Sequence, residues 1–126
     1  MRVLIINLTR FGDVLQTQPV VHALADGGHE VGFACLDNFA EAAALLDGVQ
    51  ALFPLPGGRL LATLDADWRR SAAVLSDFGM AVRRFAADRV LNLTSTLSAR
   101  LLARLLAGSG PVGGFSVDEQ GFGDNG

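Results

Sequence analysis

The sequence predicts an α/β fold, a doubly wound parallel sheet of five strands in the spatial order 3-2-1-4-5. Residues 3–6 form an unbroken apolar run, which is typical of a central strand covered by helices on both faces. An apolar stripe at helical spacing follows from Val14 to Leu24. The same alternation repeats along 126 residues, half of them hydrophobic, enough to fill the core of one domain.

The later elements are predicted from the same two periodicities. Four further apolar runs, bounded by glycine, proline or polar residues, are predicted as strands over residues 29–35, 49–55, 89–93 and 111–117. Between them we expect a short helix through Leu46 and one long helix, or two consecutive ones, within residues 59–87. A last helix carries the apolar residues Leu97, Leu101, Leu102, Leu105 and Leu106.

Two polar loops are expected to form one site. In the predicted strand order the sheet reverses direction between its first and fourth strands, and ligands of open α/β sheets bind at such a point. The loops that leave these strands are Thr9 to Asp13 and Asn92 to Thr96. They should face each other across one crevice.

Asp13 is the first candidate for chemistry in this crevice. Its carboxylate follows a strand and precedes a helix, so it either caps the helix or acts as a general base toward a bound hydroxyl. Arg10 either binds a phosphate or carboxylate or is simply solvated. Asn92, Thr94 and Ser95 either bind sugar hydroxyls or phosphate or cap a helix.

Composition excludes several partners and chemistries. The net charge of −3 predicts no attraction to nucleic acid. All ten basic residues are arginines, so lysine-dependent Schiff-base and P-loop chemistry is excluded. The single cysteine, Cys35, is predicted to be buried and inert, which favours a reduced, cytoplasmic setting. His22 and His29 lack partners at metal-ligand spacing, and no membrane span or targeting signal is predicted.

Three familiar classes of α/β protein also fail to match. The first loop lacks the Gly-x-Gly-x-x-Gly pattern of nicotinamide dehydrogenases, and no acidic residue ends the second strand. Receiver domains need an aspartate where Phe53 stands and a lysine that this chain lacks. The Gly-x-Ser-x-Gly elbow of serine hydrolases is absent.

Three segments of the sequence match those of a known family. The opening MRVLII is followed by RFGDVLQTQPV at residues 10–20, which resembles the start of the heptosyltransferases, glycosyltransferase family 9. Residues 88–93 (DRVLNL) resemble its D-x-x-x-N-L strand. Residues 112–115 (VGGF) resemble its V-G-F strand, with one extra glycine. The resemblance covers nearly the whole chain and implies a Rossmann-like domain, the first half of a GT-B fold.

The resemblance also implies roles. Asp13 would be the catalytic base for inverting transfer, without a metal ion or other cofactor, from a nucleotide sugar such as ADP-heptose. The acceptor would be a lipopolysaccharide core sugar at the cytoplasmic face of the inner membrane, with peripheral membrane contact. Gly12 would let the acceptor approach the backbone, and Thr9 and Arg10 would lie beside it. Arg59 matches no motif of the family but is a candidate for acceptor phosphates.

The chain departs from the family in length. Heptosyltransferases have two Rossmann-like domains and bind the donor mainly in the second. We therefore expect residues 1–117 to be an acceptor-binding domain and 118–126 a glycine-rich tail or linker. Whether the chain is an enzyme thus depends on the parent protein, because the 126 residues alone are expected to be inactive. Apolar surface left open by a missing domain would allow a homodimer.

A competing hypothesis comes from a different functional class. It makes the chain a noncatalytic, flavodoxin-like domain in which Thr9, Asn92 and Ser95 hold a small phosphate-bearing ligand. Substitution of Asp13 by asparagine separates the two hypotheses. A base loses rate by orders of magnitude, whereas a helix cap loses about 1 kcal/mol of stability.

Overall fold

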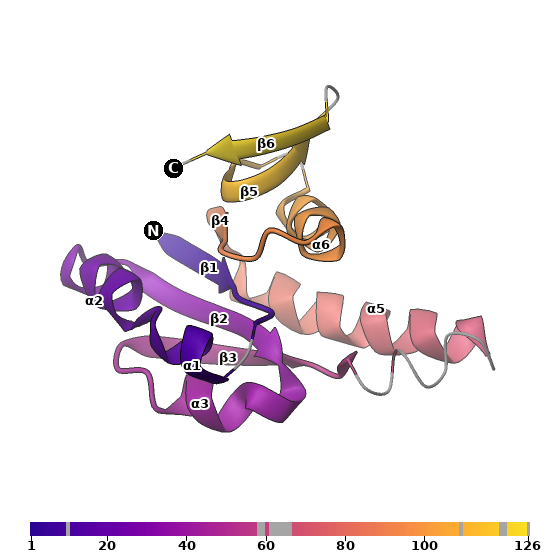
Figure 1. The fold of residues 1–126 in the computed structure, drawn as a ribbon, viewed down its shortest axis with the longest axis horizontal. Coiled ribbons are helices and arrows are strands. Elements are labelled where there is room, and N and C mark those ends of the chain that lie inside the picture. The colour runs from indigo at the N-terminus through magenta and orange to yellow at the C-terminus, as the bar shows by residue number, and fades with distance from the viewer. Residues whose placement is uncertain (10, 58–59, 61–66, 109, 119–120, 126) are drawn as a thin grey trace.

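A six-stranded sheet forms the centre of the protein (Figure 1). The structure is a computed structural model and describes residues 1–9, 11–57, 60, 67–108, 110–118 and 121–125. Within these ranges the sheet order is β3-β2-β1-β4-β5-β6. The strands are β1 (Arg2–Ile6), β2 (Glu30–Leu36), β3 (Val49–Leu55), β4 (Arg89–Asn92), β5 (Val112–Asp118) and β6 (Gly121–Asn125). The first five are mutually parallel, which confirms the predicted fold class and the order 3-2-1-4-5.

The sixth strand was not expected from the sequence. Strand β6 pairs antiparallel with β5, with Asp118 opposite Gly121, in the segment expected to be a glycine-rich tail or linker. Glycine-rich composition argues against regular structure only weakly, because an edge strand gains its hydrogen bonds from its neighbour. The division of the chain into a domain and a linker stays a prediction.

Helices cover both faces of the sheet. They are α1 (Phe11–Leu15), α2 (Gln18–Asp26), the 3₁₀ turn η1 (Asp37–Phe39), α3 (Ala40–Ala44), α5 (Trp68–Phe85) and α6 (Leu97–Ala107). Helices α1, α2 and α3 lie on one face, and α5 and α6 lie on the other (Figure 1). None of the helices in the described ranges is both long and apolar enough to cross a membrane.

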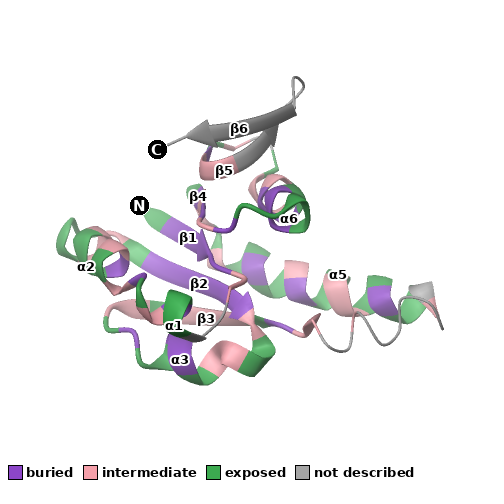
Figure 2. Ribbon diagram, in the orientation of Figure 1, coloured by how far each residue is buried: buried purple, intermediate pink, exposed green. Residues whose placement is uncertain are grey.

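The core consists of two apolar layers separated by the sheet. Leu4 and Ile6 of β1 point toward α5 and α6, where they pack with Phe78. Ile5, between them in sequence, points to the opposite layer and packs with Val21 of α2. Strands β1 and β2 are therefore buried along most of their length (Figure 2). This is the environment that an unbroken apolar run predicts, since side chains alternate between the two faces of a strand.

The first helix differs from its prediction. One helix from Val14 is expected, but the structure has two, α1 and α2, with a break at Gln16 and Thr17. Pro19 lies in the first turn of α2. Proline has no N–H to donate to the preceding turn, so a helix readily starts there and does not continue through it. Helix α1 begins at Phe11, so Asp13 lies within its first turn, as the third of its five residues, and does not precede the helix.

Contrary to what their spacing predicts, the leucines of α6 do not all lie on one buried face. Leu102 is buried, but Leu97, Leu101 and Leu105 are each more than half exposed. The sheet-facing side of α6 is instead made largely of small residues such as Ala103, which is fully buried. Small side chains let the helix approach the sheet closely, and the larger leucines on the next rows point outward.

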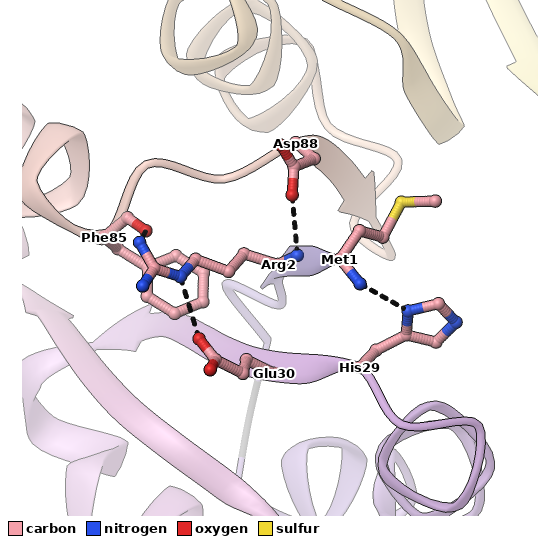
Figure 3. A network of polar contacts seen from close by, with 6 residues as sticks. All are labelled: Met1, Arg2, His29, Glu30, Phe85 and Asp88. Atoms are coloured by element: carbon pink, nitrogen blue, oxygen red, sulfur yellow. Dashed lines mark hydrogen bonds and ion pairs between the residues drawn. The ribbon is translucent and has the colours of Figure 1, made fainter.

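A polar network closes the amino-terminal edge of the sheet (Figure 3). The backbone N–H of Arg2 donates to Asp88 Oδ2 at 2.8 Å, and Arg2 Nε pairs with Glu30 Oε2 at 2.8 Å. The amino group of Met1 contacts His29 Nδ1 at 3.2 Å. These contacts join β1 to its neighbours, and the contact with Met1 gives His29 a structural role.

Candidate functional site

A shallow hollow lies at the carboxyl edge of the sheet, beyond the ends of β1 and β2. Its volume is about 380 Å³, and it is lined by Leu8, Thr9, Asp13, Leu36 and Phe39. Among the residues that the structure describes, the lining is apolar apart from one hydroxyl and one carboxylate. An oriented sugar presents hydroxyls and an apolar ring face, and a wall of this composition can contact both.

Asp13 supplies the only ionisable side chain among these lining residues. It is exposed, and its carboxylate forms no hydrogen bond or ion pair with any residue that the structure describes. The capping role considered from the sequence is therefore not seen within the described part of the chain. A solvent-accessible carboxylate beside a hollow is able to accept a proton from a bound hydroxyl.

The other predicted residues of the first loop are placed as follows. Thr9 is half-buried and lines the hollow, and its hydroxyl donates a hydrogen bond to Asn7 Oδ1. Gly12 is exposed, and a Cβ added there would meet no atom within 4 Å, so there is room for a ligand beside its backbone. Arg10 and Arg59 lie outside the described residues.

Asn92 forms its side-chain hydrogen bonds within the protein, and its expected role as a binding residue stays a prediction. It is fully buried at the end of β4. Its Nδ2 donates to the carbonyl oxygens of Thr94 and Phe115, each at 3.0 Å, and its Oδ1 accepts from the N–H of Thr94 at 3.0 Å. The side chain shapes the loop and fastens it to β5. A polar residue at a strand end can thus point inward as well as outward.

The two loops do adjoin, as the strand order predicts. The backbone N–H of Leu8 donates to Thr94 Oγ1 at 2.8 Å, and the N–H of Leu93 donates to the Ile6 carbonyl at 2.8 Å. Thr94 is buried, so its hydroxyl serves this contact between loops. Ser95 is exposed, and its carbonyl oxygen accepts from Arg100 Nε at 2.8 Å. Of the second loop, Ser95 is thus the predicted residue that remains accessible.

Other hollows and clusters offer less chemistry. A hollow of about 290 Å³ between α5 and α6 is mostly apolar, with Leu75, Met80 and Leu105 in its wall. Within the described residues no three histidine, cysteine or acidic side chains gather as a metal site would require. Asp88, which shares the D-x-x-x-N-L segment with Asn92, lies at the opposite edge and joins β4 to β1.

Part of the lining was not predicted from the sequence. Leu36 is the last residue of β2 and Phe39 ends the 3₁₀ turn that follows, so the rule that located the other two loops could have located them as well. The buried residues Asn7 and Arg100, which form hydrogen bonds to the two loops, were also not predicted from the sequence. Residues 7–9 and 92–94 are the same tripeptide, Asn-Leu-Thr, and this repeat is a signal that the sequence does contain.

Solved structures of heptosyltransferases share this fold. E. coli heptosyltransferase WaaC with ADP matches with a TM-score of 0.74 and 21% identity, over 95% of this chain and 37% of that chain. The same enzyme with ADP-2-deoxy-2-fluoro heptose gives 0.74 and 24%, with the same coverage. A family 9 glycosyl transferase from Veillonella parvula gives 0.70 and 16%, over 91% of this chain and 32% of that chain.

These similarities establish the fold, a Rossmann-like α/β domain that these heptosyltransferase structures also contain. The chain spans just over a third of the length of the WaaC chains that it matches. No protein-family model and no curated protein matches the sequence.

Proposed function

We propose that this chain is the acceptor-binding domain of a glycosyltransferase that uses a nucleotide-activated sugar, with Asp13 as the general base. One observation carries the proposal. In a fold shared with heptosyltransferases, an exposed carboxylate without a partner among the described residues lines a largely apolar hollow at the carboxyl edge of the sheet. Thr9, Gly12 and Ser95 border the same edge and are the accessible residues that would contact the acceptor.

The chemistry of the proposed site is a single displacement. A hydroxyl of the acceptor sugar lies against Asp13, which takes its proton as the oxygen attacks the anomeric carbon of the donor. A new C–O bond forms while the bond from that carbon to the nucleotide diphosphate breaks on the opposite face, so the configuration inverts. The proton ends on Asp13 and the electron pair leaves with the diphosphate. No metal ion takes part in this scheme.

The composition of the hollow supports acceptor binding over donor binding. A nucleotide diphosphate is usually held by arginine, lysine or backbone N–H groups, and none of the five described residues that line the hollow is cationic. We propose that the donor, an ADP-heptose or similar nucleotide sugar, is held mainly by a second domain of the parent protein. The 126 residues alone would then bind the acceptor, a lipopolysaccharide-core-type sugar, but transfer nothing.

The test is transfer of heptose from ADP-heptose by the full product of the parent gene. Asp13→Asn should lower kcat by about 10²- to 10⁴-fold, because the amide cannot take the proton. Asp77→Asn makes the same chemical change on exposed α5, and it should leave kcat unchanged. A full rate in folded Asp13→Asn would refute the role of Asp13, and transfer by the isolated 126 residues would refute the assignment of the donor to another domain.

The phosphate-binding alternative receives less support. Two of the side chains that could hold a phosphate on the second loop, Asn92 and Thr94, are buried and already form hydrogen bonds within the protein. Cytoplasmic location, peripheral membrane contact and a homodimer remain proposals about the parent protein. Its role in lipopolysaccharide biosynthesis is a proposal of the same kind.

A further inference from the structure

The tripeptide Asn-Leu-Thr occurs at the ends of two neighbouring parallel strands. Residues 7–9 follow β1, and residues 92–94 begin at the last residue of β4, which pairs with β1 so that Ile6 lies opposite Asn92. Both asparagines are almost completely buried, at 3% and 0% exposure. In both tripeptides the asparagine Oδ1 accepts a hydrogen bond from the N–H of the threonine two residues later, at 3.2 and 3.0 Å. The same local sequence has produced the same turn twice.

The two tripeptides differ in the carbonyl groups to which their asparagine Nδ2 atoms donate. Asn92 Nδ2 donates to the Phe115 carbonyl and so binds its turn to β5. Asn7 Nδ2 donates instead to the carbonyl oxygen of Asp13, at 3.4 Å, six residues along the chain. The orientation of the Asn7 amide is fixed, since the Thr9 N–H can only donate and must face the oxygen. The Asn7 amino group therefore faces α1.

A contact between the two turns completes a connected scaffold. Thr94, which is held by Asn92, accepts the Leu8 N–H at 2.8 Å, and Leu8 lies inside the first tripeptide. The backbone N–H of Asn7 donates to the Ala34 carbonyl of β2 at 2.9 Å. Hydrogen bonds thus run from β5 and β4, through both turns, to the backbone of Asp13. Within the described residues, no buried side-chain nitrogen or oxygen is left without a partner.

We propose that Asn7 is a positioning residue for Asp13, and that Thr94 anchors the turn from which Asn7 acts. The inference rests on the proposed function, because it concerns the placement of the proposed base. Helix α1 has only five residues, too few to hold its own position by helix propensity. The buried Asn7 amide donates a hydrogen bond to the carbonyl of Asp13, the third residue of this helix, and so fixes the direction in which the Asp13 carboxylate points.

The first experiment measures amide hydrogen exchange by NMR in the 126-residue protein and does not depend on transfer activity. Asn7→Asp keeps the size of the side chain and the oxygen that Thr9 needs, but it removes the N–H group that holds Asp13. Gln50→Glu makes the same amide-to-carboxylate change on the exposed, amino-terminal end of β3, and it is the matched control. Exchange at Gln16 and Thr17 should accelerate by about 10-fold or more in Asn7→Asp only.

Equal rates at Gln16 and Thr17 in the folded Asn7→Asp protein and the control would overturn the inference. If Asn7→Asp does not fold, Thr94→Val takes its place, since it removes the hydroxyl that anchors Leu8 and keeps the shape of the side chain. Thr94→Ser retains that hydroxyl and should restore the original rates. Unchanged exchange at Leu8 and in α1 in Thr94→Val would then contradict the proposal.

The second experiment measures transfer from ADP-heptose by the full gene product. A displaced base lowers kcat, and we expect a loss of about 10- to 100-fold in Asn7→Asp, with KM for the donor changed by less than about twofold. If Asp13→Asn retains its rate, the proposed function fails while the exchange result for Asn7 stands. If Asp13→Asn is inactive and Asn7→Asp keeps its full kcat, only the positioning role fails.

Discussion

The guanidinium carbon of Arg100 lies 4.9 Å from the centre of the Phe115 ring. Arg100 is 8% exposed, an unusual position for an arginine on a short surface helix. Its Nε also donates to the Ser95 carbonyl at 2.8 Å. One cation thus joins α6 to β5 and to the loop that borders the proposed site. A cation stacked on an aromatic ring away from water is held more strongly than one in solvent.

We predict that Arg100→Met lowers the free energy of unfolding by about 2 kcal/mol, since it leaves the Ser95 carbonyl without its donor and removes the cation from the ring. Methionine keeps most of the apolar stem, so packing is largely preserved. Urea unfolding followed by circular dichroism measures the change. Arg84→Met on exposed α5 is the control, with an expected change below about 0.5 kcal/mol. Equal effects of the two substitutions would contradict this prediction.

Gly114 allows β5 to approach β4 closely. It has a φ of +75°, and a Cβ at this position would overlap the carbonyl oxygen of Asn92. Gly114→Ala should therefore destabilise the protein by about 3 kcal/mol or more, because backbone strain and a clash with backbone act together. Gly79→Ala, in the interior of α5 with no atom within 4 Å of the added Cβ, should instead raise stability by about 0.5–1 kcal/mol. The two denaturant midpoints should move in opposite directions.

Ala86 ends α5 in a left-handed conformation, with φ 54° and ψ 55°. Alanine pays a steric cost there that glycine does not. Ala86→Gly should therefore raise the free energy of unfolding by about 0.5–1 kcal/mol, measured by urea titration. An unchanged or lowered midpoint would mean that the glycine's added freedom in the unfolded chain outweighs the relieved strain.

Burial, and then the nearby charge of Asp37, raise the pKa of the Cys35 thiol from 9.0 to about 11. Between these values the unfolded chain releases the thiol proton while the folded protein keeps it. The free energy of unfolding should therefore fall as pH rises from 9 to 11, by roughly 1.4 kcal/mol per pH unit at most. The chain contains no tyrosine and no lysine, so no other kind of side chain ordinarily titrates in this window. Cys35→Ala should abolish the slope, and a slope that persists would assign it elsewhere.

The sequence was most informative where the pattern is local. The apolar runs located the first five strands, and the helical spacing of residues such as Phe78 and Val82 located the buried face of α5. The ends of elements were harder to predict. Helix α5 stops at a left-handed alanine instead of a glycine, and the first helix is interrupted near Pro19.

For the candidate site, the sequence identified which loops meet but not which way their side chains point. Asp13 and Thr9 line the hollow, as expected of the loop after the central strand. Asn92 is also a polar residue at the carboxyl end of a central strand, but it is fully buried and donates to the backbone carbonyl of Phe115. Phe39 enters the hollow from a third loop, which the pairing of β1 with β2 brings alongside.

The sequence by itself determined the alternation of strands and helices. Each segment contains its own apolar run or stripe, and the spacing of those residues decides which element can bury it. The direction of each polar side chain was decided only by the tertiary structure. Whether an asparagine or a threonine faces water or a neighbouring backbone depends on which carbonyl and N–H groups of distant segments lie beside it. Asn92 donates to the Phe115 carbonyl, and Thr94 accepts from the Leu8 N–H. That pairing exists only once the strands have assembled.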